Sequence, residues 1–218
     1  MAKSTAQSRL RGARKNMYQD LILDAAEVEF ADQGYEATKV QSIAVAAGVS
    51  LATLYATLPT KRDIYRAVHA RRLEALFAAV STQGDNAEGP LELMLAGIDL
   101  YIEFHMRHPH YLRMHLQEGH AWPTPGELRS PEQMMAWKVG LSRVAEMFEI
   151  GVRAGIFVEH EPPLLMARTM MAMHQVRLAD WVAAGMKEPI EAVLEKIHRQ
   201  FIRTFCRPEF AERLGKAK

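Results

Sequence analysis

Positive charge is concentrated at the start of the sequence, where it could attract a polyanion such as DNA. Residues 1–19 contain five basic side chains and no acidic one: Lys3, Arg9, Arg11, Arg14 and Lys15. The first 72 residues hold 11 basic and 7 acidic side chains, whereas the remaining 146 hold 16 and 19, so the net charge of +1 hides an asymmetry. This balance favours contact between the N-terminal end and phosphate groups, although a basic tail that is merely solvated has the same composition.

A second group of chemically useful side chains lies in the rest of the chain. Eight of the nine histidines and eleven of the thirteen methionines follow residue 90. Methionine adapts to varied apolar molecules, and a few polar groups orient them, so one interpretation is a ligand pocket. Its candidate lining residues are Tyr101, Phe104, Trp137, Met147, Phe148, Met166, Met170, Met173, His174 and Arg177. The other interpretation is an ordinary core filled with methionine and aromatic side chains.

The histidines also raise the question of a metal or haem site. The candidate ligands are His105, His108, His110, His115 and His120. Pro109 interrupts the helical spacing of this group, and the single cysteine, Cys206, excludes any site made of thiolates alone. Because no acidic cluster stands nearby at ligand spacing, we expect no metal and no cofactor.

The sequence lacks the motifs of an enzyme or a membrane protein. It contains neither a glycine-rich phosphate loop after a strand nor a Gly-x-Ser-x-Gly motif. With 49% apolar residues the chain can bury a core, yet it has no run of about 18 uncharged apolar residues. Its first eight residues also lack the apolar segment of a secretory signal. We therefore expect a cytoplasmic protein without membrane contact or enzymatic activity.

These side chains must be positioned by helices, because apolar residues recur at helical spacing between helix-breaking prolines and glycines. A first helix is predicted between Tyr18 and Phe30, with Gly34 as its stop signal. Further helices are predicted from residue 60 to about 80, and at about 90–107, 109–118, 131–154, 163–185 and 189–206, with residues 119–130 as a loop. The prediction is an all-α fold.

Residues 38–58 predict two short helices joined by a tight turn. The first begins with Thr38-Lys39-Val40-Gln41, which has the form of a capping box, and the second begins at the N-cap residue Ser50. Gly48 suits a turn that needs a positive φ. The inward-facing residues are expected to be Ile43, Ala47, Val49 and Leu54, with the small Ala44 where the helices approach. This is a helix-turn-helix, whose second helix fits the major groove of DNA.

The flanking residues make the pattern more specific. It is formed, in this order, by Ile22-Leu23-Asp24-Ala25-Ala26, Phe30, Gly34-Tyr35-Glu36-Ala37-Thr38, Ile43-Ala44, Ala47-Gly48-Val49-Ser50, Thr53-Leu54-Tyr55 and Lys61. Over roughly residues 19–66 the pattern closely resembles the N-terminal domain of the TetR family of transcriptional regulators. The resemblance implies a helix-turn-helix DNA-binding domain (19–66) and a helical ligand-binding and dimerisation domain (67–218). They follow the basic N-terminal arm (1–18) that the charge distribution indicates.

The resemblance also implies that residues 50–57 form the DNA-reading helix. Together with their polar neighbours, the implied DNA-contacting residues are Lys39, Val40, Gln41, Val49, Ser50, Ala52, Thr53, Tyr55, Ala56, Thr57 and Lys61. The Tyr55 hydroxyl can donate to a phosphate, and the Lys61 ammonium stands beside a helix start that attracts one. Where the family often has glycine before the threonine, this chain has Ala52, and Ala56 stands where an aromatic pair commonly begins. We therefore expect sparse direct reading of bases, with support from the basic arm and from DNA shape.

The expected function is that of a ligand-responsive repressor. A two-fold homodimer, joined by the helices at 163–185 and 189–206, would hold its recognition helices about 34–36 Å apart on an inverted-repeat operator in double-stranded DNA. A small apolar or amphipathic effector between helices of the second domain would change that separation and release the operator. The alternative is a helical small-molecule carrier or enzyme in which residues 38–58 form only a packed corner.

Overall fold

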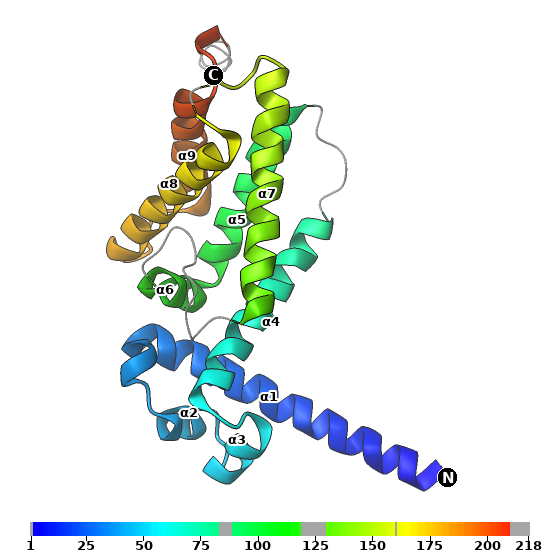
Figure 1. The fold of residues 1–218 in the computed structure, drawn as a ribbon. Coiled ribbons are helices and arrows are strands. Elements are labelled where there is room, and N and C mark those ends of the chain that lie inside the picture. The colour runs from blue at the N-terminus through cyan, green and yellow to red at the C-terminus, as the bar shows by residue number, and fades with distance from the viewer. Residues whose placement is uncertain (1, 83–88, 119–129, 160, 210–218) are drawn as a thin grey trace.

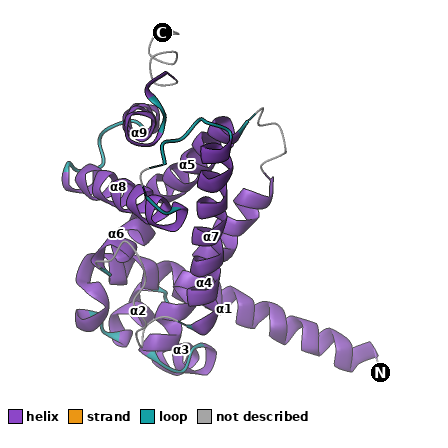
Figure 2. Cartoon of the chain, turned by 45° about the horizontal axis from the view of Figure 1, so that its top comes forward, coloured by secondary structure: helices purple, strands orange, loops and turns teal. Residues whose placement is uncertain are grey.

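A computed structural model describes residues 2–82, 89–118, 130–159 and 161–209 (Figure 1). Within these ranges the chain forms α1 (Ala2–Ala37), α2 (Val40–Ala46), α3 (Leu51–Thr57), α4 (Lys61–Thr82), α5 (Pro90–Arg107), α6 (Pro109–Gln117), α7 (Pro131–Arg153), α8 (Pro163–Ala183) and α9 (Ile190–Phe205). Figure 2 shows these helices joined by loops. The predicted all-α fold is confirmed. The predicted loop from Gly119 and the candidate ligand His120 lie outside the described residues.

Local sequence signals set most helix boundaries, as predicted. Pro90, Pro109, Pro131 and Pro163 each occupy the first turn of a helix, where the missing N–H has no intrahelical acceptor to lose. Ser50 caps α3, since its hydroxyl accepts a hydrogen bond from the Thr53 N–H at 3.1 Å. Gly48 adopts a φ of 66° in the turn between α2 and α3. These boundaries confirm the helix-turn-helix at 38–58.

The predicted capping box at Thr38–Gln41 is wrong. Lys39 is the N-cap residue of α2, and no side chain caps that helix. The Thr38 hydroxyl instead donates to the carbonyl oxygens of Gly34 (2.7 Å) and Glu29 (3.2 Å). The hydroxyl therefore satisfies carbonyls at the end of the preceding helix, where acceptors without intrahelical partners are available.

α1 is longer than the predicted first helix. It includes residues 2–18, so the predicted N-terminal arm is helical and continuous with the predicted DNA-binding domain. Its N-terminal half projects from the body of the molecule (Figure 1). Near the other end, Gly34 has φ 78° and ψ 162°, which interrupts the helical geometry at the predicted stop.

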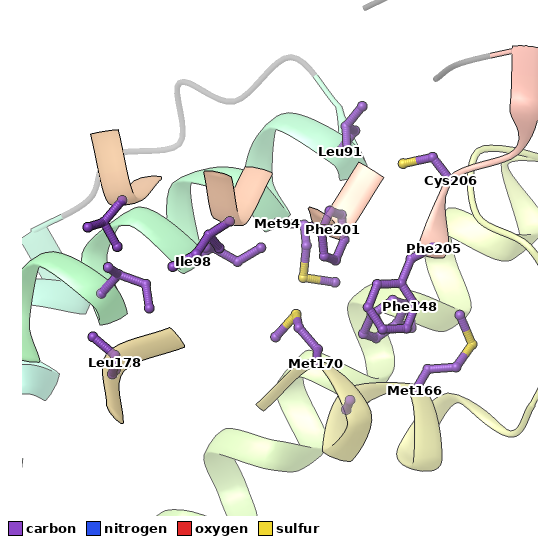
Figure 3. Packing of buried hydrophobic residues seen from close by; sticks show 14 of the residues in the cluster. Leu91, Met94, Ile98, Phe148, Met166, Met170, Leu178, Phe201, Phe205 and Cys206 are labelled. Atoms are coloured by element: carbon purple, nitrogen blue, oxygen red, sulfur yellow. The ribbon is translucent and has the colours of Figure 1, made fainter. Parts of the chain in front are cut away.

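Two hydrophobic clusters form the interior. The N-terminal cluster includes Ile22, Phe30, Ile43, Leu54 and Ile64, all without exposed surface. The larger C-terminal cluster contains side chains of α5, α7, α8 and α9, and Figure 3 shows part of its packing.

α6 belongs to both interiors. Its Met114 packs in the N-terminal cluster, whereas its Leu112 packs in the C-terminal cluster. Within the described ranges, no individual helix has both the length and the apolarity required to cross a bilayer, and α2 with α3 meets that test only as a pair bent by 104°.

Candidate DNA-binding surface and effector core

The turn between α2 and α3 fixes the direction of the predicted DNA-reading helix. The Val49 N–H donates to the Ala44 carbonyl at 3.0 Å, which closes the turn behind α2. Ile43 and Leu54 are fully buried beneath the two helices and Ala44 is 4% exposed, so the helices approach closely. α3 is therefore a short, capped helix with its inner side anchored in the core.

The predicted DNA-contacting residues lie on α3, at the start of α2, in the turn between the two helices and at the start of α4. Lys39, Gln41, Ser50, Ala52, Tyr55 and Ala56 are exposed, whereas Val40, Val49, Thr53, Thr57 and Lys61 are partly buried. Tyr55 is 42% exposed, and its hydroxyl has no partner among the described residues. A phenol in this position can donate a hydrogen bond to a phosphate. Four of the other side chains, Val40, Val49, Ala52 and Ala56, are apolar, as the sequence indicated.

Two threonines and a serine on this surface are engaged within the helix. The Ser50 and Thr53 hydroxyl oxygens are 2.8 Å apart, and the Thr57 hydroxyl donates to the Thr53 carbonyl at 2.8 Å. A hydroxyl that donates internally can still accept a second hydrogen bond. Thr57 can therefore accept from a base edge but not donate to a phosphate in this geometry.

Lys61 has a different position from the one that its predicted phosphate contact requires. Its ammonium donates to the carbonyl oxygens of Tyr35 (2.8 Å), Glu36 (3.1 Å) and Thr38 (3.2 Å). It also lies 4.5 Å from the centre of the Tyr35 ring. Because an ammonium has three donors, all of them are used at the end of α1. In this geometry Lys61 positions the helix-turn-helix against α1 and has no donor left for DNA.

Other cations remain accessible near α3. Arg62 is exposed on the first turn of α4 and has no partner in the part of the chain that the structure describes. On α1, Arg14 donates to the Tyr18 hydroxyl (3.0 Å), and Lys15 is exposed. The side chains of Lys3, Arg9 and Arg11 lie outside the described residues. Sequence reasoning missed Arg62, although its place beside Lys61 at a helix start was a usable signal.

A buried carboxylate joins α1 to α4. Glu27 is 4% exposed and accepts two hydrogen bonds from Arg72, at 2.8 Å and 2.9 Å. Arg71 reaches Glu27 at 3.3 Å and Asp24 at 2.7 Å. The forked guanidinium suits such a bidentate pair. Sequence reasoning missed this contact, and the available signal was an acid, Glu27, at helical spacing inside an apolar stripe.

α6 is the second connection between the domains. Gln117 donates to the Ala31 carbonyl of α1 at 2.8 Å, and Arg113 pairs with Asp32 at 2.8 Å. Glu118, directly after α6, accepts a hydrogen bond from the Tyr65 hydroxyl of α4 at 2.9 Å. Any displacement of α6 or α4 therefore reaches α1 through directional contacts.

Several predicted effector residues fill the packed C-terminal core. Phe148 is fully buried, with ring centres of Phe205 at 5.0 Å and Phe157 at 5.4 Å. Figure 3 shows Met166 and Met170 of α8 beside this aromatic group. Trp137, Met147 and Met173 are partly buried against the same cluster. The positions of these residues favour the interpretation as an ordinary core, because tight packing leaves little space beside them.

The polar candidates form a separate group beside that core. Tyr101 on α5 and His174 on α8 have rings 6.2 Å apart, and Tyr101 packs against His105 at 4.3 Å. Burial lowers the pKa of His174 to about 4, helped by the nearby charge of His198, and burial raises the pKa of the Tyr101 hydroxyl. Both side chains are therefore neutral near pH 7.

The remaining two candidates are already engaged. Phe104 is buried with its ring 4.5 Å from that of His108, and Arg177 donates its Nε–H to Gln200 at 2.9 Å.

An open groove of about 1030 Å³ lies between α4 and α7. Leu73, Phe77 and Val80 of α4 face Gln133, Ala136 and Arg143 of α7 across it. None of the predicted effector residues lines this groove. The available sequence signal was the continued apolar spacing of Leu73, Phe77 and Val80 at the end of α4.

Among the residues that the structure describes, no group of three histidine, cysteine, aspartate or glutamate side chains could hold a metal ion. Burial, together with the charge of His115, lowers the pKa of His105 to about 3, and its Nδ1 is 2.8 Å from the Tyr101 carbonyl oxygen.

Comparisons with known proteins agree with this arrangement. The family described as "Bacterial regulatory proteins, tetR family" matches residues 22–68. An HTH-type transcriptional repressor of Streptomyces coelicolor is 28% identical over 103 residues, which are 47% of this chain and 50% of the repressor. The match therefore spans about half the length of that relative.

Two solved structures are similar over most of their length. The ketosteroid transcriptional regulator of Mycobacterium tuberculosis has a TM-score of 0.73 at 19% identity, over 87% of this chain and 95% of its own. The fatty acid degradation regulator of Bacillus halodurans has a TM-score of 0.67 at 20% identity, over 84% of this chain and 96% of its own. At these identities the likeness shows a shared fold.

Proposed function

We propose that this chain is a ligand-responsive transcriptional repressor, because its residues 22–68 match the family that the sequence resembles. In this proposal it binds a palindromic operator in double-stranded DNA as a homodimer, in the cytoplasm and without a cofactor. The observation that carries the proposal is the exposed outer side of α3, a capped helix anchored by Leu54 with an unpaired Tyr55 hydroxyl facing outward.

The operator contacts follow from the surface around α3. α3 enters the major groove, where Ala52 and Ala56 offer van der Waals contact to thymine methyl groups. Lys39, Gln41 and Tyr55 supply the polar contacts, and Arg62 adds a phosphate contact from the first turn of α4. Lys61 acts as a positioning residue through the three carbonyls at the end of α1. Phosphate contacts carry no sequence information, so DNA shape contributes to specificity.

The homodimer forms through α8 and α9. On α8, Leu164 and Leu165 are 42% and 43% exposed, and Val176 is 69% exposed. Large apolar side chains that remain exposed on one helix favour burial against a second copy. A two-fold axis beside α8 and α9 then presents two α3 helices to successive major grooves, about 34–36 Å apart.

The effector acts through α4 and α6. A small apolar or amphipathic molecule among the helices of the C-terminal domain shifts these two helices, and the Glu27–Arg72 and Gln117–Ala31 contacts carry the shift to α1. The two solved regulators of this fold are named for ketosteroids and fatty acid degradation, which supports an effector of this kind. A coupling of about 1–3 kcal/mol changes operator affinity roughly 5- to 150-fold.

The test is selection of genomic DNA fragments by the purified protein, followed by titration at several salt concentrations. Selective retention and a steep loss of affinity with salt are expected, with about 0.9 added to the slope for each neutralised phosphate. Tyr55→Phe, which removes one hydroxyl, should weaken binding to a selected fragment about 2- to 10-fold, as loss of one hydrogen bond predicts.

Lys138→Ala is the matched control, because Lys138 is an exposed cation on α7. It should leave operator affinity unchanged. A carrier or an enzyme without DNA binding would retain no fragment selectively, and that result would refute the proposed function.

A further inference from the structure

Among the buried polar side-chain atoms that lack a hydrogen-bond partner within the described ranges, two belong to neighbouring rings in the C-terminal domain. They are the hydroxyl oxygen of Tyr101 on α5 and the ring atom Nδ1 of His174 on α8. The two rings are 6.2 Å apart, and His174 is 3% exposed. Two neighbouring helices therefore present unpaired polar groups in one buried region.

Apolar side chains lie along α5 and α8 on either side of this pair. Met170 and Leu178 precede and follow His174 by one helical turn, and Ile98 precedes Tyr101 by three residues; Figure 3 shows all three in the core between α5 and α8. Buried hydroxyl and imidazole groups in proteins are nearly always hydrogen-bonded, because an unpaired one has lost its water without compensation. The described residues supply no hydrogen-bond partner for either atom, so both atoms are left to bond with a ligand.

The charge state of the pair limits what it can receive. Burial keeps the Tyr101 hydroxyl protonated and His174 neutral. Of the charged groups on the neighbouring helices, Asp99 contacts His198, and Arg177 donates to the neutral Gln200. Tyr101 and His174 themselves offer no charge to an ionic ligand group, which would lose its hydration beside them, and this loss is strongly unfavourable. A neutral group with hydrogen-bonding atoms fits.

We propose that Tyr101 Oη and His174 Nδ1 together bind the hydroxyl or carbonyl group of an uncharged, otherwise apolar effector lodged between α5 and α8. This inference rests on the repressor function proposed above and assigns the chemical class of its effector. The Tyr101 hydroxyl donates to the effector oxygen, and His174 Nδ1 accepts or donates according to its tautomer. The apolar skeleton lies against the neighbouring methionine, leucine and isoleucine side chains.

The pair lies next to the helix that reaches the DNA-binding domain. The Tyr101 ring contacts His105, whose ring is 5.4 Å from that of His115 on α6. Gln175, adjacent to His174, has its Nε2 3.3 Å from His115 Nε2. α6 in turn holds α1 through Gln117. An effector that separates α5 from α8 therefore displaces α6 and, through it, α1.

The test uses the full chain with Nile red, an uncharged apolar dye that carries a carbonyl oxygen, and with the anionic dye anilinonaphthalene sulfonate. Saturable binding of Nile red to the wild type is expected, and both Tyr101→Phe and His174→Leu should weaken it about tenfold, the effect of losing one hydrogen bond. Tyr18→Phe is the matched control, because it removes a hydroxyl on α1 outside the C-terminal domain. It should not change Nile red affinity.

Thermal unfolding of the dye-free protein supplies an independent measurement. Because the Tyr101 hydroxyl has no partner, Tyr101→Phe should leave Tm unchanged or raise it. A fall in Tm would show a hydroxyl already paired with buried water and would overturn the proposal. Three other results would also overturn the proposal. They are Nile red affinity that neither substitution changes, absence of saturable Nile red binding, and anionic-dye binding that depends on the two residues more strongly than Nile red binding does.

Operator binding separates this inference from the proposed function. Without dye the wild type should bind the operator, and Nile red should weaken that binding. If the wild type binds no operator, the proposed function fails, whereas dye binding that depends on Tyr101 and His174 would still support the ligand site. If operator binding is normal and the dye dependence is absent, only the ligand site fails.

Discussion

The two domains satisfy their polar groups in opposite ways. Around α3 the polar groups that hold the shape are paired inside the chain: Ser50 caps the helix and Lys61 closes the end of α1. The Tyr55 hydroxyl, by contrast, faces outward without a partner. In the C-terminal domain the Tyr101 hydroxyl and His174 Nδ1, which lack a partner among the described residues, are buried. The unpaired hydroxyl of the N-terminal domain therefore lies on its surface, whereas the unpaired polar groups of the C-terminal domain lie in its interior.

This difference suits the two partners that a ligand-responsive repressor needs. A DNA-reading helix must keep a fixed direction, because a duplex offers its contacts at fixed spacing. An effector core must respond to its ligand, and a ligand can shift an equilibrium only through contacts that differ between two states. Unpaired buried groups provide such a difference, since the ligand-bound state satisfies them.

The largest expected effect comes from the packed part of the C-terminal core. Phe148→Ala removes a fully buried ring that contacts Phe157 and Phe205. We expect a loss of about 3–5 kcal/mol in the free energy of unfolding, from lost burial and the cavity left behind. Denaturant unfolding monitored by circular dichroism measures it.

Met135→Ala on the same helix is the control, since Met135 is 61% exposed and its change should stay within about 0.5 kcal/mol. If Phe148→Ala cost no more than the control, this core would be loosely packed and the contrast between its packed and unpaired parts would be lost.

The second effect is a dependence of stability on pH that arises inside the C-terminal domain. Burial lowers the pKa of His174 to about 4 and that of His105 to about 3, below the usual value near 6.5, with His198, His115 and His108 nearby. The unfolded chain then binds more protons, so the stabilisation present above pH 6.5 is lost as pH falls towards 4. Each histidine should cost about 2 kcal/mol at pH 5.

His174→Leu tests this assignment. Its unfolding free energy should fall less steeply between pH 7 and pH 5 than that of the wild type, by about half. Lys138→Ala should keep the wild-type dependence. An unchanged slope in His174→Leu would mean that this histidine is hydrated in the native protein, and the contrast between the domains would weaken.

The third effect concerns the N-terminal domain. Lys61→Ala removes three hydrogen bonds to carbonyls at the end of α1 and should lower the free energy of unfolding by about 1–3 kcal/mol. Tyr55→Phe should leave it unchanged, because the hydroxyl is exposed and unpaired. Thermal unfolding of both variants measures the difference. Equal Tm values together with a loss of DNA binding in Lys61→Ala would restore the phosphate contact that the sequence predicted.

Lys61 also shows where sequence reasoning ends. Helix starts at Pro90, Pro109, Pro131 and Pro163, and the Ser50 cap, were predictable because each acts within one turn of its own position. The Lys61 ammonium bonds the Tyr35 carbonyl, 26 residues away, and that choice depends on how α4 crosses α1. A local pattern identifies the cation but not its partner.

The effector residues illustrate the same limit. Helical spacing identified a methionine-rich face on α8, but spacing does not distinguish a packed face from a ligand-lining one. Phe148 and Met170 lie in the core, whereas His174, on the same α8 face as Met170, is buried with an unpaired nitrogen. Only the positions of neighbouring helices separate these cases, and they follow from tertiary packing.

The smallest expected effect tests the helical extension of α1. Lys15 is exposed on this extension, and the sequence has a cluster of basic residues at the same end. If α1 lies along the operator, Lys15→Ala should weaken binding only a few fold and reduce the salt slope by about 0.9, the contribution of one phosphate contact. Because this contact is independent of sequence, the loss should be equal for operator and unrelated DNA. Lys138→Ala should change neither quantity. An unaltered salt slope in Lys15→Ala would confine DNA contact to α2, α3 and the start of α4, which would make the outward-facing surface of the N-terminal domain smaller than the charge pattern predicts.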